Sequence, residues 1–241
     1  MAGRSSTAFP KDFAMLIRIP GLLSPEELAH CRKVLTETAW VDGRVTAGVQ
    51  SAIAKHNLQV PEDAPQAQAL GQIILKALGT NVTFNAAALP LRVFPPLFNR
   101  YDEGMGFTAH VDNAIRYVAS ARQRIRTDVS STLFLSEPDE YDGGELVIED
   151  SYGEQRVKFA AGDLALYPAD SLHRVEPVTR GSRWAAFFWS QSMVRDDATR
   201  ALLYNFDRSI TLVRAELGDG HPAVLGITST YHNLLRKWAE L

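Results

Sequence analysis

The spacing of apolar residues changes twice along the chain and divides it into three parts. Before residue 84, apolar side chains recur every three or four positions, which is the period of a helix with one buried face. From 84 to 188, short runs of Val, Phe, Tyr, Leu and Thr are separated by Gly, Pro, Asp and Asn. After Met193 the helical period returns. This pattern predicts a mostly β core with helices before and after it.

Two helices are expected in the first part. The first starts after Ser24, whose side chain can cap the helix while Glu27 completes a capping box, and runs to about Thr38. The second opens after Val60, runs for about sixteen residues and ends at Gly79. We expect both helices to cover a sheet and to carry no chemistry.

The middle part contains many short segments with the composition of strands. These segments are residues 87–93, 97–101, 107–111, 130–135, 146–148, 155–159, 164–167, 173–175 and 183–190. Many short strands with turn residues between them are typical of a β-sandwich or jelly roll.

The last part predicts two amphipathic helices, at residues 198–217 and 224–238, that would cap a site or mediate self-association into a homo-oligomer. The predicted organisation is a flexible extension at 1–14, a main domain at 15–193 with its β core at about 84–190, and a C-terminal helical subdomain at 194–241.

Composition and charge exclude several classes of protein. The 241 residues carry 25 Lys and Arg against 28 Asp and Glu, a net charge of −3, and no basic run, which argues against binding nucleic acid or a membrane surface. Cys31 is the only cysteine, so no internal disulfide or cysteine zinc site can form. No apolar run is long enough to span a membrane, and the first residues lack a signal sequence, which favours a cytoplasmic location.

The first candidate for chemistry is the pair His110-Val-Asp112. Side chains alternate along a strand, so residues two apart point to the same side. One imidazole and one carboxylate would therefore face a single point. They form two thirds of the two-histidine, one-carboxylate triad that binds non-haem Fe(II) and leaves other coordination positions open.

A second histidine from elsewhere in the chain is needed to complete such a triad. His30 and His56 lie in the N-terminal part, and His221 and His232 lie in the C-terminal part. His173 is late in the β region, after a turn and at the start of a strand. An isolated histidine on a strand is more often structural, but the three residues together favour a metal site.

Arg183 enters the apolar strand at residues 184–190. A buried charge needs a partner, and a guanidinium matches a carboxylate through two parallel hydrogen bonds. Arg183 could therefore bind the far carboxylate of a dicarboxylic cosubstrate whose 2-oxo acid end chelates the metal. A surface ion pair is the alternative for this residue.

The order of these residues resembles that in Fe(II)- and 2-oxoglutarate-dependent dioxygenases of the prolyl-4-hydroxylase-like branch. More closely, it resembles the bacterial PKHD-type hydroxylases, which are associated with iron uptake. The segments that carry this resemblance are residues 98–107, 110–115, 142–146, 167–173 and 231–236.

The resemblance implies a double-stranded β-helix in which His110, Asp112 and His173 bind Fe(II). Arg183 would bind the C5 carboxylate of 2-oxoglutarate, and Tyr101 would donate a hydrogen bond to the same cosubstrate. It further implies ascorbate as the reductant. The reaction would hydroxylate an unidentified small molecule, amino acid or peptidyl group and release succinate and CO2.

Two other functions stay open from the sequence. One is a non-catalytic protein that senses iron or 2-oxoglutarate, and the other is a cupin-like metalloenzyme of different chemistry, which has no need for Arg183. The arginine-rich segment 113–128 is either a substrate lid or a solvated loop. Thr132, Phe134 and Trp189 either line the pocket or belong to the core.

Overall fold

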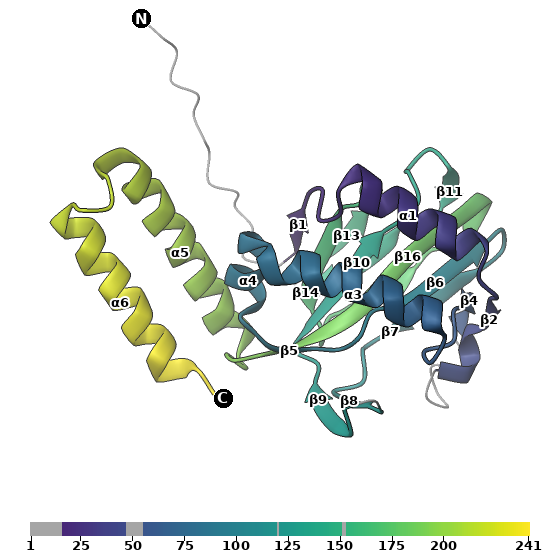
Figure 1. Cartoon of the computed structure of the whole chain (residues 1–241), viewed down its shortest axis with the longest axis horizontal. Coiled ribbons are helices and arrows are strands. Elements are labelled where there is room, and N and C mark those ends of the chain that lie inside the picture. Colours follow the sequence, from purple (N-terminus) through teal and green to yellow (C-terminus); the bar gives the residue numbers. More distant parts are fainter. Residues whose placement is uncertain (1–15, 47–54, 120, 151–152) are drawn as a thin grey trace, which may run out of the picture.

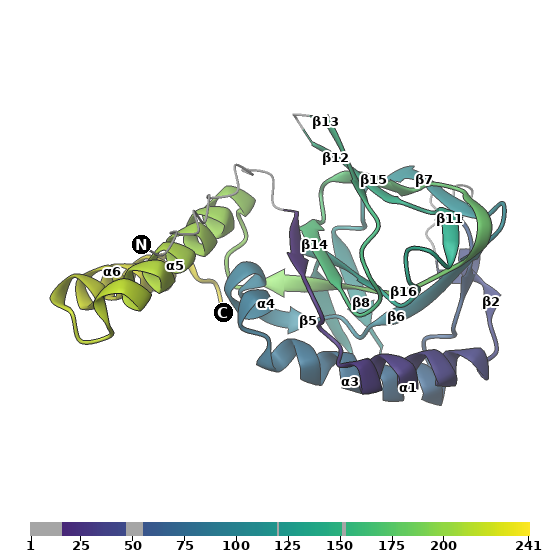
Figure 2. The same cartoon turned by 90° about the horizontal axis from the view of Figure 1, so that it is seen from above.

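The computed structural model describes residues 16–46, 55–119, 121–150 and 153–241. Two antiparallel sheets face each other, and two long helices lie along the outer face of the larger sheet (Figure 1, Figure 2). These helices are α1 (Pro25–Thr36) and α3 (Pro65–Thr80). The arrangement confirms the predicted jelly-roll core covered by N-terminal helices. The predicted extension at 1–14 lies outside the described residues.

The strands pair in the following order. Within the described residues, the larger sheet consists of β1 (Ile17–Ile19), β14 (Leu164–Pro168), β10 (Val129–Phe134), β16 (Val178–Ser192), β6 (Leu97–Asp102), β4 (Leu58–Gln59) and β2 (Val41–Asp42), with β11 (Tyr141–Gly143) and β5 (Pro90–Val93) also paired to β16. The smaller sheet consists of β13 (Gly153–Val157), β12 (Leu146–Asp150), β15 (Leu172–Val175), β7 (Gly106–His110) and β3 (Lys55–His56). A separate hairpin is formed by β8 (Ile115–Val118) and β9 (Gln123–Arg126).

Side-chain alternation on the larger sheet separates two cores. Leu133 of β10 and Ala186 of β16 face outward and pack in one cluster with Leu70 of α3 and the buried free thiol of Cys31 of α1. Phe134, the next residue of β10, faces inward and packs in a second cluster between the sheets. The cover helices therefore bury one face of the large sheet, and its other face is left to build a pocket.

The N-terminal helices differ from the prediction mainly at their ends. The capping box is present, because the Glu27 amide donates to Ser24 Oγ at 3.2 Å and the Ser24 amide donates to Glu27 Oε2 at 2.9 Å. Helix α1 ends two residues before Thr38, and α3 starts at Pro65 and continues past Gly79. A short 3-10 helix, Gly43–Thr46, follows β2.

One predicted strand is partly wrong. The segment 87–93 begins inside helix α4 (Val82–Ala88), and only β5 is extended. The Asn81 side chain caps α4 by accepting a hydrogen bond from the Phe84 amide at 2.8 Å. This cap and the alanines that follow it favour a helical turn over the expected strand.

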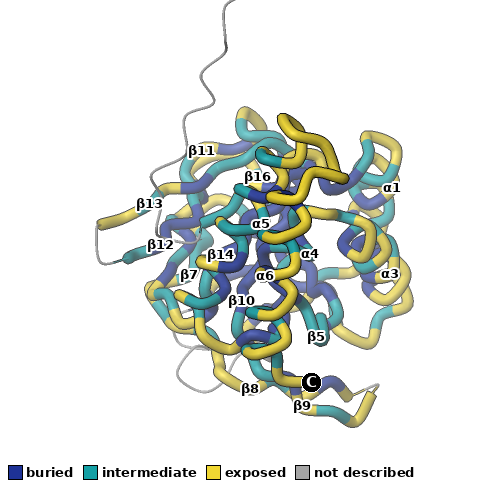
Figure 3. The backbone as a smooth tube through the Cα atoms, turned by 90° about the vertical axis from the view of Figure 1, so that its left-hand side faces the viewer, coloured by how far each residue is buried: buried dark blue, intermediate teal, exposed yellow. Residues whose placement is uncertain are grey.

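The C-terminal helices α5 (Asp197–Leu217) and α6 (Pro222–Trp238) form a hairpin that projects from the β body (Figure 1). Both confirm the helices predicted at the C-terminus. Their small shared core contains Leu203, Ile210 and Tyr231, and much of the remaining helix surface is exposed (Figure 3). Within the described part of the chain, these and the other helices are too short or too polar to cross a membrane.

A buried guanidinium helps to join this hairpin to the β body. Arg200 of α5 is fully buried, and its Nη1 donates to the carbonyls of Val194 at 2.8 Å and Arg195 at 2.7 Å. Its Nη2 donates to the carbonyl of Asp128 at 3.3 Å, next to β10, and pairs with Asp197. Arg200 therefore ties α5 to the ends of two central strands.

We predict that Arg200→Met lowers the free energy of unfolding by about 3 kcal/mol, because the buried carbonyl of Val194 and the partly buried carbonyls of Arg195 and Asp128 lose their donor. Urea unfolding followed by circular dichroism measures this change. Arg195→Met is the matched control, since Arg195 is exposed, and it should change stability by less than about 0.5 kcal/mol. Equal stability of the two variants would contradict the anchoring role.

Candidate active site

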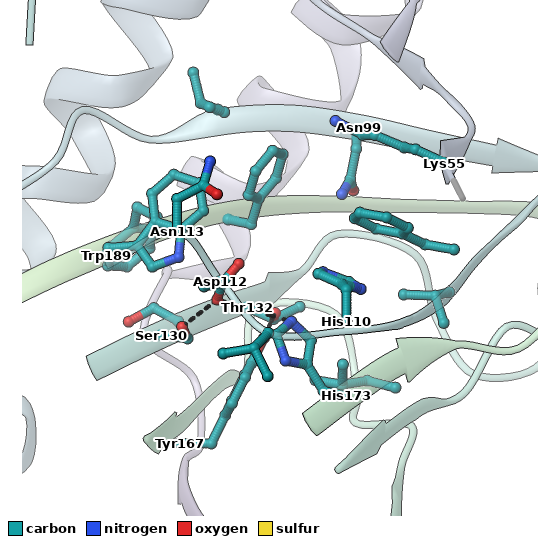
Figure 4. Close-up of a pocket in the computed structure, with 18 of the residues that line it drawn as sticks. Lys55, Asn99, His110, Asp112, Asn113, Ser130, Thr132, Tyr167, His173 and Trp189 are labelled. Carbon is teal, nitrogen blue, oxygen red and sulfur yellow. Dashed lines mark hydrogen bonds and ion pairs between the residues drawn. The ribbon is translucent and has the colours of Figure 1, made fainter. Parts of the chain in front are cut away.

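Strand pairing brings the two histidines together. In the smaller sheet β7 and β15 are antiparallel, and His110 is the register partner of His173. Paired residues project from the same face of a sheet, and the two imidazole rings lie 4.3 Å apart between centroids. One ligand atom from each histidine and one Asp112 oxygen all lie within 4.8 Å of one another. The structure therefore brings the three predicted residues to one point (Figure 4).

The strand alternation predicted for Asp112 is wrong, although its position in the site is as expected. Strand β7 ends at His110, and Asp112 lies in the loop that follows. A side chain from the opposite sheet orients it instead, since Ser130 Oγ of β10 donates to Asp112 Oδ2 at 2.5 Å (Figure 4). The same carboxylate oxygen lies 3.7 Å from His173 Nε2. No motif or spacing in the sequence pointed to Ser130.

Backbone carbonyls fix the tautomer of both histidines. His110 Nδ1 lies 2.8 Å from the carbonyl of Thr108, and His173 Nδ1 lies 2.9 Å from the carbonyl of Ser171. A carbonyl only accepts, so each Nδ1 carries a hydrogen, and Nε2 is the ring nitrogen left to bind a metal. Burial and the neighbouring His173 lower the pKa of His110 to about 4, so His110 is a neutral imidazole at pH 7.

These three side chains fit a divalent metal. Two imidazole nitrogens and one carboxylate oxygen are the donor set of non-haem Fe(II) sites with open positions. Metal bonds of about 2.0–2.2 Å bring ligand atoms to within about 4 Å of one another, so small side-chain rotations complete the site.

Arg183 lies deeper in the same pocket, on β16 and paired with Tyr101 of β6. Arg183 is 1% exposed. Its guanidinium carbon lies 5.4 Å from the centroid of the Tyr101 ring and 5.2 Å from that of the Phe134 ring. Among the described residues, its Nε and one Nη have no hydrogen-bond partner. A buried cation in this state is costly, and a carboxylate in the pocket would complete its hydrogen bonds.

Tyr101 is buried beside this guanidinium. Burial raises the pKa of its phenol, so the hydroxyl is protonated and can donate a hydrogen bond at neutral pH. The Asn99 side-chain amide donates to the same hydroxyl at 3.5 Å. The residues predicted for cosubstrate binding therefore share one wall of the pocket.

The pocket encloses about 840 Å³ of empty space, including its open mouth. All five predicted site residues line it, and so do Thr132 and Trp189, for which the sequence left a core position equally open. Phe134 packs under Arg183 and belongs to the core between the sheets.

In its described part, the segment 113–128 is not an unstructured loop, and its role as a substrate lid stays a prediction. It forms the β8–β9 hairpin, and Val118 and Ile125 anchor it in a cluster with Trp189. Arg116 reaches back from this hairpin into the pocket. Alternation of apolar residues over such short strands is too weak a signal to predict the hairpin.

Lys55 is a pocket residue that the sequence did not indicate. It lies on β3, paired with Phe107 of β7, and is 6% exposed. Its ammonium donates to Gln59 Oε1 at 2.9 Å. Burial and nearby Arg116 lower the pKa of Lys55 to about 8.

Comparisons with known proteins agree with this geometry. Residues 96–191 match the family model of the 2OG-Fe(II) oxygenase superfamily, and residues 197–240 match that of the PKHD-type hydroxylase C-terminal domain. The first match covers the strands of the pocket from β6 to β16, and the second covers the α5–α6 hairpin.

Solved structures share the fold. A prolyl-4-hydroxylase of Pseudomonas putida aligns with a TM-score of 0.50 at 21% identity and covers 74% of this chain and 94% of its own. A prolyl hydroxylase of Trichoplax adhaerens, solved with a hypoxia inducible factor peptide, aligns with a TM-score of 0.51 at 13% identity over 78% and 86% of the two chains.

Sequence relatives are much closer. A PKHD-type hydroxylase of Gluconobacter oxydans is 67% identical over 227 residues, which are 94% of this chain and the whole of the relative. A PKHD-type hydroxylase of Methylobacterium nodulans is 62% identical over the same shares. With this identity over the full length of its relatives, the chain belongs to the PKHD-type hydroxylase family of 2-oxoglutarate- and Fe(II)-dependent oxygenases.

Proposed function

We propose that this protein binds Fe(II) through His110, Asp112 and His173 and hydroxylates a substrate at the expense of 2-oxoglutarate. The observation that carries the proposal is the convergence of two imidazoles and one carboxylate in a pocket that also holds a buried arginine. Fe(II) and 2-oxoglutarate are the cofactor and cosubstrate that the oxygenase superfamily implies.

Arg183 would bind the C5 carboxylate of 2-oxoglutarate, and the Tyr101 hydroxyl would donate a second hydrogen bond to it. The partnerless nitrogen atoms of Arg183 support this role, because a bidentate carboxylate satisfies a guanidinium fork. When bound, iron and cosubstrate supply the oxidation, in which 2-oxoglutarate and O2 yield succinate, CO2 and a hydroxyl group on a substrate C–H bond.

The residues around the triad hold its ligand atoms in place. The carbonyls of Thr108 and Ser171 keep each Nε2 free, and Ser130 Oγ fixes the carboxylate of Asp112. Phe107 stacks on His110 at 3.6 Å between ring centroids and excludes water from that side. Partners of this kind commonly change metal affinity by about 10- to 100-fold when removed.

Several expectations stay predictions. Ascorbate as the reductant, a cytoplasmic location, self-association through α5 and α6, and a link to iron uptake rest on the sequence resemblance or on the sequence pattern. The same holds for the division into an extension at 1–14, a dioxygenase domain at 15–193 and a helical subdomain at 194–241. A sensing protein would use the same ligands but would form no succinate.

We predict that His110→Ala and Asp112→Ala each weaken Fe(II) binding by more than about 100-fold, since each removes a ligand and not an outer partner. Anaerobic titration calorimetry measures the affinity, and succinate formation in the presence of O2 measures turnover. His30→Ala is the control, because His30 is exposed on α1. Unchanged affinity in the ligand variants would refute the metal site, and tight binding without any succinate would favour the sensor.

We predict that Arg183→Met weakens 2-oxoglutarate binding by about 100-fold and leaves Fe(II) affinity unchanged, because two charge-assisted hydrogen bonds are lost. Methionine fills a similar volume and removes the buried charge, so the variant should fold. The rise in melting temperature that saturating 2-oxoglutarate gives the Fe(II) protein should then disappear. A variant that keeps this rise would show that the cosubstrate binds elsewhere.

We predict that the metal-free protein loses stability as the pH falls from 6.5 to 4. The folded pKa of His110 is about 4 against an ordinary 6.5, so in this window the unfolded chain binds the extra proton. Urea unfolding at several pH values measures the slope. His110→Asn should flatten it and His30→Asn should not, whereas an unchanged slope in His110→Asn would contradict the assignment.

A further inference from the structure

The pocket has a second end that the proposed cosubstrate does not use. Residues of β16 on one face run from Arg183 to Trp189, which is about 20 Å along a strand. Asp112 is bonded to Ser130, and Ser130 is the register partner of Trp189. The candidate metal ligands therefore lie nearer to Trp189, and 2-oxoglutarate would extend from them toward Arg183. The Trp189 end is left for the substrate.

Arg116 places a cation at this end. Its guanidinium carbon lies 4.5 Å from the centroid of the Trp189 ring and 5.3 Å from the centroid of the Phe94 ring. Within the ranges that the structure describes, it makes no hydrogen bond or ion pair with a carboxylate. Two aromatic faces thus hold a half-buried guanidinium in position and leave its donors available to a ligand.

Lys55 places a second cation on the other side of the triad. Its ammonium nitrogen lies 5.8 Å from the centroid of the Phe107 ring and 5.6 Å from the centroid of the Phe187 ring. Figure 4 shows Lys55 on the side of His110 and Trp189 on the side of Asp112. The pocket therefore has a positive charge on both sides of the candidate metal ligands.

The two cations are close enough to affect each other. Burial lowers the pKa of both side chains, and Arg116 is the second cause of the shift at Lys55. Nearby carboxylates offset part of this repulsion, since Asp42 attracts Lys55, Glu62 attracts Arg116, and Asp112 attracts both. A negatively charged group between the two cations would relieve their repulsion, whereas a positively charged one would add to it.

Building on the proposed function, we propose that the substrate is an anion. Its carboxylate or phosphate group binds between Arg116 and Lys55, and its apolar part packs on Trp189 and Phe187. A guanidinium fork and an ammonium both suit an oxyanion. Arg116 and Lys55 are then the residues that select the substrate, and Arg183 selects the cosubstrate.

Four small probes with one phenyl group test this charge preference. They are 3-phenylpropanoate, 2-phenylethylphosphonate, 3-phenylpropan-1-ol and 3-phenylpropylamine. The full-length protein is loaded with Mn(II) and saturating 2-oxoglutarate, so that the Arg183 end is occupied, and binding is measured from the paramagnetic relaxation of the probe protons. At least one of the two acids should bind about tenfold more tightly than the alcohol, and the amine should bind most weakly. The tighter of the two acids identifies carboxylate or phosphate as the natural group.

Variants assign the preference to the two cations. Arg116→Gln and Lys55→Gln should each weaken the acid by about tenfold and leave the alcohol unchanged. Arg124→Gln is the matched control, because Arg124 is exposed on the same hairpin and does not line the pocket. It should bind the acid as the unmodified protein does.

The inference is overturned if neither acid binds better than the alcohol, if neither binds at all, or if Arg124→Gln weakens the acid as much as Arg116→Gln does. The same spectra report on the 2-oxoglutarate protons. If Mn(II) relaxes these protons and the acids fail, only the anionic substrate is wrong. If Mn(II) leaves them unaffected, the proposed function is wrong and the substrate site is wrong with it.

Discussion

The site depends on the antiparallel register of β7 and β15, which sets His110 directly opposite His173. A shift by one residue would turn one imidazole to the other face of the sheet. The facing sheet contributes the remaining constraint, because Ser130 of β10 holds the carboxylate of Asp112. The candidate metal site therefore exists only when the two sheets are packed together, and the cover helices serve the site by burying the far face of the larger sheet.

Two buried arginines show how the same side chain serves stability in one place and binding in another. Arg200 gives its hydrogen bonds to three backbone carbonyls and pairs with Asp197, so it acts within the fold. Arg183 is as deeply buried, yet two of its nitrogen atoms have no hydrogen-bond partner in the described residues. Both Nη atoms of Arg200 are bonded within the fold and only its Nε lacks a partner in the described residues, which indicates an anchor, whereas the open Nε and Nη of Arg183 beside a pocket indicate a ligand site.

The sequence predicted the elements that depend on strong local signals. Observed helices correspond to the capping box at Ser24 and to the helical period after Met193. Observed strands correspond to most of the short segments with strand-like composition between them. The pair His110 and Asp112 was recognised from spacing, but the strand ends before Asp112, so alternation gave the wrong reason for the proximity. Helix α4 was missed because its cap at Asn81 outweighed the strand-like residues after it.

Long-range contacts could not be predicted. The packing of distant strands places Ser130 beside Asp112, Lys55 in the pocket and Arg116 against Trp189. No characteristic local sequence pattern marks any of these positions. The order of His110, His173 and Arg183 could be recognised because metal and carboxylate chemistry restricts the residue types that can serve. Many residue types can serve in substrate selection, so the residues that select the substrate can be identified only in the folded pocket.

The most direct measurement of the central claim is a crystal structure of the protein with Mn(II) and 2-oxoglutarate. The account predicts an ion coordinated by His110, Asp112 and His173, with the far carboxylate of 2-oxoglutarate on the guanidinium of Arg183. An ion bound by other side chains, or a cosubstrate whose far carboxylate lies away from Arg183, would contradict it.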